Sequence, residues 1–222
     1  MGPALAAAIG IPVVFAALCA GLWAAGVVAP DWETRALMLQ IPSAEQLNRA
    51  EPLSPSTVVV SYLVLSVVLG PTFFALLFLA SEIGWRDYFL SRLLPVGRVR
   101  ALLLSGLFWG LWLALLGLAD PWNELSVGPF LLRQVAFGVA FGAFVGEAWR
   151  RSRHVGLAAV ITGSLQAQLQ GVWFYLFPDS EYLGIGLPAT AIWAALALAL
   201  IAWPEKGLAR DDAPSSGAVA RG

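Results

Sequence analysis

Long apolar runs dominate this sequence and decide what it can fold into. About six of them are close to the roughly 20 residues that a helix needs to cross a bilayer; they cover residues 4–28, 57–80, 99–118, 130–149, 155–177 and 184–203. Only 12% of the residues are charged, about half the share found in soluble domains. We therefore predict an all-α fold: a polytopic membrane helix bundle of about six transmembrane helices.

The remaining composition excludes several functions. The net charge is −1, which provides no electrostatic footprint for nucleic acid. The single cysteine, Cys19, cannot form an internal disulfide. The single histidine, His154, excludes a metal site that needs two or three imidazoles. We expect no cofactor and no metal.

The order of apolar and polar segments indicates one transmembrane domain over residues 1–203. A Pro/Ser/Gly/Asp-rich tail, 204–222, follows and is expected to be disordered. The first run lacks a basic leader and is long for a signal peptide, so we expect it to be retained as a helix. Residues 30–56 form a polar loop with room for an interfacial helix around 32–39. Gly70-Pro71 should kink the second run, residues 81–94 should form a membrane-edge helix, and 94–97 should turn.

Glycines in the fourth run predict a close helix contact. Gly138, Gly142 and Gly146 are spaced by four, so they share one helix face. Small residues on a common face let two backbones approach closely inside a membrane. We expect this face to pack against another helix.

Basic residues predict the topology. Six spans place ten basic residues on one side and three, with most of the acidic residues, on the other. The ten are Arg86, Arg92, Arg98, Arg100, Arg150, Arg151, Arg153, Lys206, Arg210 and Arg221, and the three are Arg35, Arg49 and Arg133. The basic side is expected to be cytoplasmic, which places both termini in the cytoplasm.

A charged segment at the end of the second run is the candidate site. Glu82 and Arg86 are four residues apart, so they share a helix face and can pair. Ionisable residues at membrane depth are functional candidates by default, although charges at helix ends also reach the headgroups. Spacing alone leaves both interpretations open.

The surrounding residues carry a family resemblance. Glu82-Ile-Gly-Trp-Arg86-Asp-Tyr, followed by Phe108-Trp-Gly-Leu-Trp112, resembles two motifs of the CPBP family, which includes the CAAX prenyl proteases and bacteriocin-processing proteins. The resemblance covers about residues 60–175. It implies an intramembrane endopeptidase fold in a membrane that is expected to be the bacterial inner membrane.

The departures from the family pattern fall on its polar residues. Ser81 stands where the family has its first Glu, and Leu113 where it has its first His. The third motif, His-Gly-x-x-Asn, corresponds to Thr162-Gly-Ser-Leu-Gln166. Ser81 cannot act as a carboxylate base, and Leu113 offers neither donor nor acceptor. We expect a site without its base, with Thr162, Gln166 and Gln170 on one inward face toward Glu82 and Trp112.

Three functions remain open from the sequence. The first is a catalytically silent CPBP-like protein that acts as a scaffold, chaperone or accessory subunit for other integral membrane proteins. The second is a divergent CAAX-type peptidase that uses Glu82 with Thr162 and Gln166. The third is a lipid, quinone or pigment site in the remaining cavity.

Overall fold

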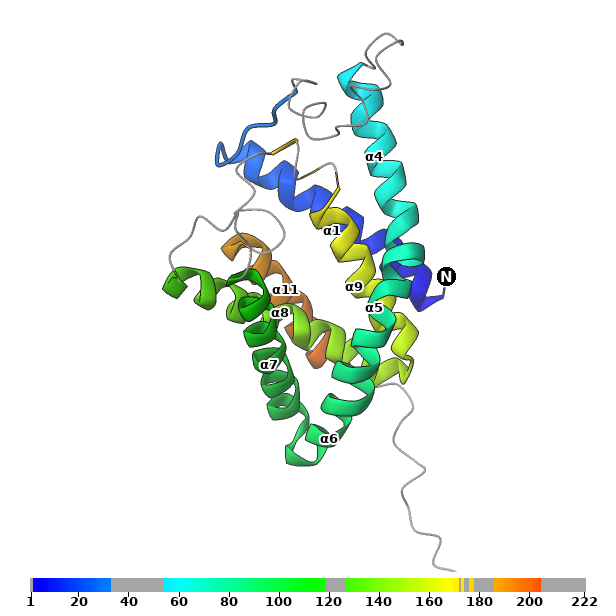
Figure 1. Cartoon of the computed structure of the whole chain (residues 1–222), viewed down its shortest axis with the longest axis vertical. Helices are drawn as coiled ribbons and strands as arrows, with labels where there is room; N and C mark the ends of the chain where they lie inside the picture. Colours follow the sequence, from blue (N-terminus) through cyan, green and yellow to red (C-terminus); the bar gives the residue numbers. More distant parts are fainter. Residues whose placement is uncertain are drawn as a thin grey trace, which may run out of the picture.

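The protein is a bundle of helices in the computed structural model, which describes residues 2–32, 54–118, 127–171, 173, 176–177 and 186–204 (Figure 1). Every regular element in these ranges is helical, which confirms the predicted all-α class. In chain order they are α1 (Pro3–Ala24), α4 (Pro55–Leu69), η1 (Gly70–Phe74), α5 (Ala75–Glu82), η2 (Ile83–Leu90), α6 (Ser91–Leu93), η3 (Leu94–Val96), α7 (Arg98–Leu118), α8 (Val127–Ser152), α9 (Val155–Leu169) and α11 (Leu187–Ala202).

Four helical segments within the described residues are long and apolar enough to cross a membrane: Pro3–Ala24, Ser56–Val96, Arg98–Leu118 and Val127–Ser152. They correspond to the first four predicted runs. The last two runs are apolar helices but shorter than predicted, because α9 has 15 residues and α11 has 16. At 1.5 Å per residue each covers about 22–24 Å, less than the roughly 30 Å hydrocarbon core.

Local backbone chemistry explains where the predicted boundaries shift. α1 ends at Ala24, before the predicted residue 28, and Gly26 follows with a positive φ of 69°. Such a left-handed glycine is a common helix terminator. α9 ends at Leu169 instead of 177, and Gly171 then packs so closely on the Ala167 carbonyl that a Cβ there would lie 2.6 Å from its oxygen.

The second run continues well past its predicted end. One helical rod is formed by α4, η1, α5, η2, α6 and η3. It follows the long axis in Figure 1 and contains the 41-residue candidate span Ser56–Val96. Gly70 and Pro71 do not break the rod; they lie in η1, a π-helical turn. A wider turn accommodates a residue that cannot donate a backbone hydrogen bond. The predicted turn at 94–97 is confirmed, with Gly97 at φ 108°.

Glycines set the closest helix contacts, as predicted for α8. α7 and α8 lie side by side (Figure 1), and Gly106 and Gly110 of α7 face Gly138 and Gly142 of α8. A Cβ at Gly110 would lie 2.8 Å from the Cα of Val135, and one at Gly138 would overlap the backbone of Gly110. No side chain larger than hydrogen fits at this crossing.

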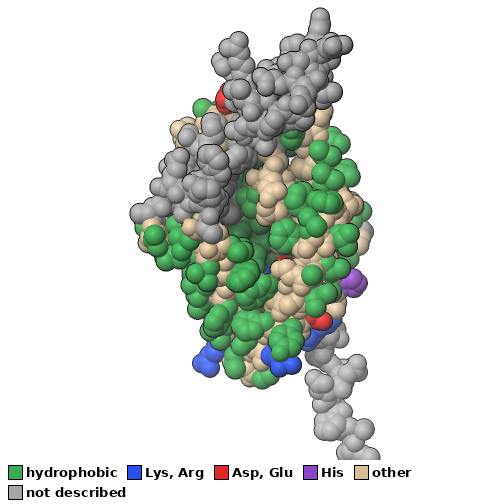
Figure 2. Space-filling model, viewed as in Figure 1, with side chains coloured by type: hydrophobic (Ala, Val, Ile, Leu, Met, Phe, Trp, Pro, Cys, Tyr) green, Lys and Arg blue, Asp and Glu red, His purple; other side chains and the backbone are tan. Residues whose placement is uncertain are grey.

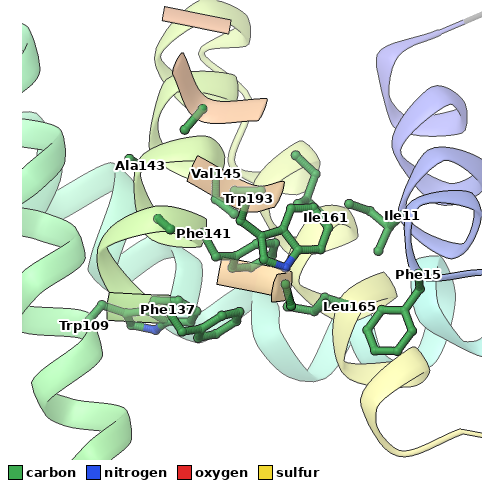
Figure 3. Close-up of a cluster of buried hydrophobic side chains, with 14 of the residues drawn as sticks. Ile11, Phe15, Trp109, Phe137, Phe141, Ala143, Val145, Ile161, Leu165 and Trp193 are labelled. Atoms are coloured by element: carbon green, nitrogen blue, oxygen red, sulfur yellow. The ribbon is translucent and has the colours of Figure 1, made fainter. Parts of the chain in front are cut away.

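Aromatic side chains fill the core between α7, α8 and α11. Phe137 and Phe141 stack with ring centroids 5.5 Å apart, and Trp193 of α11 meets Phe141 edge-on at 5.0 Å (Figure 3). Trp109 tilts against both phenylalanines. Phe15 and Ile11 of α1 belong to the same buried cluster. This core fixes α7, on which part of the candidate site lies.

The outer surface matches a lipid environment. Hydrophobic side chains cover much of the described part of the face in Figure 2, and arginine side chains appear at its lower end. Exposed apolar residues include Val60, Leu76, Leu115, Leu132 and Leu198. The predicted interfacial helix at 32–39 and the predicted tail at 204–222 lie almost entirely outside the described residues.

Candidate functional site

The Glu82–Arg86 pair lies inside the bundle. Arg86 Nε is 3.1 Å from Glu82 Oε2, and both side chains are 0% exposed. The pair spans the junction of α5 with η2, where the helix widens into π geometry. Helix turns of this kind often occur at functional sites. The predicted ion pair is therefore confirmed, and it is buried rather than directed at headgroups.

All three family-like segments meet at this pair. Thr162 Oγ1 of α9 donates a hydrogen bond to Glu82 Oε1 at 2.9 Å. On α7, Arg86 Nη1 donates to Ser105 Oγ at 3.5 Å, and the guanidinium carbon lies 5.4 Å from the centre of the Trp109 ring. A cation over an indole face is attracted by the ring quadrupole. The site therefore links α5, η2, α7 and α9.

The pair is held by charge more than by directed hydrogen bonds. The Nε–Oε2 contact meets the distance of an ion pair, but neither atom forms a well-directed hydrogen bond. Arg86 Nη2 also has no hydrogen-bond partner among the described residues. Buried groups in this condition depend strongly on their counter-charge, because removal of either partner strands the other.

The other predicted site residues do not join this network. Ser81 and Gln166 are half-buried and make no side-chain hydrogen bond within the described part of the chain. Leu113, one turn beyond Trp109 on α7, is half-buried and packs against the hydrophobic core. Leu113 is the residue that the sequence comparison of the motifs predicts at the position of the family's first His, and its side chain is apolar.

Two expectations about orientation were wrong. Gln170 is exposed instead of inward, because α9 ends at Leu169 and Gln170 is its C-cap. Trp112 is 49% exposed; Trp109, three residues earlier, is the tryptophan at the site.

The buried amide of α9 is Gln168, which the sequence prediction missed. Its Nε2 donates to Ser66 Oγ of α4 at 3.1 Å, and its Oε1 accepts from Trp173 Nε1 at 2.7 Å. The side chain is 0% exposed. Gln168 lies on α9, and its two partners lie on α4 and in the segment after α9, so its amide ties these three parts of the chain together.

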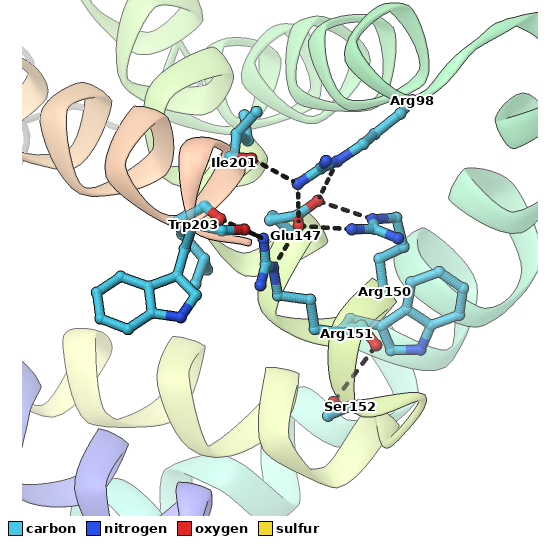
Figure 4. A network of polar contacts seen from close by, with 9 residues as sticks. Arg98, Glu147, Arg150, Arg151, Ser152, Ile201 and Trp203 are labelled. Atoms are coloured by element: carbon cyan, nitrogen blue, oxygen red, sulfur yellow. Dashed lines mark hydrogen bonds and ion pairs between the residues drawn. The ribbon is translucent and has the colours of Figure 1, made fainter. Parts of the chain in front are cut away.

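A second charged cluster was also missed. Glu147 of α8 is 0% exposed and accepts hydrogen bonds from Arg98, Arg150 and Arg151 (Figure 4). Glu147 is an acidic residue within an apolar run, which is a signal for a functional or structural charge. Arg150 and Arg151 follow at three and four residues, the spacing of helical ion pairs.

The donor set around Glu82 suits a structural network better than a metal. Thr162 offers a hydroxyl and Arg86 a guanidinium. Among the described residues, no three His, Cys, Asp or Glu side chains come together as a metal site.

These features define an integral membrane protein of the polytopic α-helical class. The sequence model of one family, described as "Type II CAAX prenyl endopeptidase Rce1-like", matches residues 62–167. The matched segment contains Glu82, Arg86, Trp109 and Thr162. Residues 62–167 are therefore similar to the Rce1-like family, which confirms the CPBP resemblance. No curated protein and no solved structure matches the chain.

Proposed function

We propose that this protein is a catalytically silent member of its family that acts as a scaffold, chaperone or accessory subunit for other integral membrane proteins. The supporting observation is the state of Glu82. Its carboxylate is fully buried, paired with Arg86 and hydrogen-bonded to Thr162. A general base must be within reach of a water or substrate proton, and both oxygens of Glu82 already face protein groups.

The side chains around Glu82 supply no substitute for the missing base. Ser81 carries a hydroxyl in place of the family's first carboxylate, and Leu113 carries no polar atom in place of the imidazole. The one hydroxyl proton of Thr162 is already donated in a hydrogen bond to Glu82. Loss of one preorganised donor commonly costs about 10²–10³ in rate, and groups that act as a unit fail together. The reaction of the family is therefore expected to be absent.

Outer helix faces support the role in protein contacts. In the 41-residue segment Ser56–Val96, only 17% of the residues in its most apolar stretch are buried within this chain. Val60, Val64 and Val68 repeat every four residues on one exposed side of it. A stripe of this kind is available to partner helices or to lipid. We place the protein in a bacterial inner membrane with both termini in the cytoplasm.

The test combines turnover with co-purification. The purified full chain is given prenylated and unprenylated CAAX peptides in detergent, with an active family member as the positive control. We expect no cleavage, and we expect a membrane protein partner at fixed stoichiometry after mild extraction. Cleavage that disappears in Glu82→Gln would contradict the proposal and establish the alternative, a divergent peptidase that uses Glu82.

The divergent-peptidase alternative has one observation in its favour, the direct Thr162–Glu82 hydrogen bond between two family motifs. The idea of a lipid, quinone or pigment in the same cavity stays a prediction, since no contact among the described residues bears on it.

A further inference from the structure

The apolar length of α11 is too short for a bilayer of ordinary thickness, and both of its ends are fixed. Gly186 before the helix and Trp203 after it have extended backbone, which limits the helix to Leu187–Ala202. Its 16 residues rise about 24 Å, whereas an ordinary hydrocarbon core is about 30 Å thick. Because tilt only reduces the thickness that a helix covers, about 24 Å is an upper limit.

One face of α11 is open to lipid along its whole length. The helix packs mainly against α8, and its other side exposes a stripe of residues three or four apart: Leu187, Ala191, Ala195, Leu198 and Ala202. Leu187 in the first turn and Leu198 near the end are 73% and 66% exposed. Non-helical backbone is not stable in contact with lipid hydrocarbon. The hydrocarbon beside this face therefore has to end where the helix ends.

Charged residues on α8 mark a similarly reduced thickness. Arg133 and Glu147 border the uncharged central part of α8, and at 1.5 Å per residue they are about 21 Å apart along the axis. Arg98 Nη2 donates to both Glu147 Oε1 and Ile201 O, so this border is level with the end of α11. The two neighbouring helices therefore agree on an apolar thickness of about 21–24 Å.

Other helices of the bundle are longer. The rod is uncharged from Pro55 to Ser81, a helical length of about 36–39 Å. α1 and α7 have 22 and 21 residues and cover about 31–33 Å. The rod and α11 lie on different sides of the bundle in Figure 1. The short apolar length is thus a local property of the side formed by α8 and α11.

We propose that the exposed face of α11 is covered by a locally thinned bilayer in which phospholipids with short acyl chains are enriched. A short span is accommodated by thinning, by flanking side chains that reach the interface, or by oligomerisation. Trp203 is 64% exposed and suited to the interface itself. Arg151 is held by the Leu200 and Trp203 carbonyls, so it cannot reach a more distant interface. This surface is separate from the Glu82 network and does not depend on the proposed function.

Cysteine accessibility measures where the hydrocarbon ends. Single cysteines replace Leu187, Ala195 or Ala202 in the full chain, which is reconstituted in dioleoylphosphatidylcholine nanodiscs and treated with a water-soluble maleimide. The wild-type chain, whose Cys19 is buried, gives the background. We expect both end positions to react about tenfold faster than Ala195→Cys, because the thiolate is the nucleophile and apolar surroundings suppress it.

The matched control is α7, which has the length of an ordinary span. Leu103 and Leu118 are exposed and, like Leu187 and Ala202, are 15 residues apart. Two positions at this spacing are about 22 Å apart, so a core of about 30 Å leaves at most one of them in water. At most one of the α7 pair should therefore react. Reaction at both α7 positions would show a bilayer that is thin everywhere, and protection of either end of α11 would show an undeformed core or an oligomer contact. Either result would overturn the proposal.

Fluorescence quenching tests the lipid preference. A fluorophore is attached in detergent to Ala195→Cys or to the control Leu111→Cys, which is exposed near the middle of α7. Each protein is then placed in dioleoylphosphatidylcholine nanodiscs with a small share of brominated dimyristoleoyl- or brominated dierucoylphosphatidylcholine. We expect the ratio of short-chain to long-chain quenching to be severalfold higher at position 195 than at position 111. Equal ratios at the two positions would refute the enrichment of short-chain lipid beside α11.

Discussion

Replacing Arg86 with methionine should destabilise this protein more than replacing both members of its ion pair. The single change leaves the Glu82 carboxylate at 0% exposure with only the Thr162 hydroxyl as a donor. Stranding a buried charge costs about 3–5 kcal/mol. The double change Glu82→Met/Arg86→Met removes both charges and fills similar volume. Such replacements are often neutral or stabilising.

The magnitude can be converted to a melting temperature. For chains of 150–250 residues, 1 kcal/mol shifts the midpoint by about 2–4 °C. Arg86→Met should therefore lower the midpoint by about 6–20 °C. The double variant should recover most of this loss. Part of the remaining loss would come from the contacts of Arg86 with Ser105 and the Trp109 ring.

The assay is thermal unfolding of the full chain in detergent, followed by the fluorescence of its ten tryptophans. Arg100→Met serves as the matched control, since it removes an exposed arginine without a contact in the described part of the chain. Its midpoint should stay within about 2 °C of the wild type, because surface changes are usually worth about 0.5 kcal/mol or less. Equal losses in Arg86→Met and the double variant would refute the reasoning, since stranded charge would then play no part.

Three further substitutions test the packing and the polar contacts. Gly138→Ala should destabilise the chain by about 1–3 kcal/mol, because its Cβ would overlap the backbone of α7. The control Gly84→Ala places its Cβ in open space and should not destabilise the chain. Equal unfolding midpoints for the two variants would disprove the tight crossing. Thr162→Val should cost about 1–3 kcal/mol by removing the donor to Glu82, and no loss in a detergent melt would mean that water replaces the hydroxyl. Gln168→Leu should cost a similar amount, since it removes the donor to Ser66 Oγ and the acceptor of the Trp173 indole N–H. Faster proteolysis of the segment after α9 would be its local signature, and unchanged cleavage would argue against a clamp.

Short-range spacing accounts for what the sequence predicted well. The Glu82–Arg86 pair and the glycine face of α8 both follow from residues four apart on one helix, and both are present. The apolar runs located the helices because hydropathy reports burial in lipid or protein alike. It cannot separate the two, so it did not give the lengths of α9 and α11.

α9 shows why the inward face could not be chosen in advance. Its polar residues at 162, 166 and 170 form one stripe, and those at 164 and 168 form another. α9 packs against α1, α4, α5, η1 and α8, so residues of both stripes are enclosed: Thr162, Ser164 and Gln168 are buried. Thr162 faces Glu82, while Gln168 faces Ser66 on the other side. Only the three-dimensional arrangement of these neighbours selects the partner of each.

Contacts between residues far apart in the sequence could not be predicted, for a different reason. Arg98 and Glu147 are 49 residues apart, and Arg98 is 103 residues from the carbonyl of Ile201. Nothing in the local pattern of α7 indicates those partners. The acidic residue at 147 alone could have been recognised, because a charge in an apolar run needs a partner.

The end of α11 has a consequence for how the chain is assembled. Its final carbonyls are capped by side chains of other helices: Arg98 donates to Ile201 O, and Arg151 donates to Leu200 O and Trp203 O. Translation produces α7 and α8 before α11, so the arginines that cap α11 are already present when this helix is synthesised. Docking of α11 then follows the packing of α7 against α8, and a chain that stops short of residue 200 leaves Arg98 and Arg151 without these carbonyl acceptors.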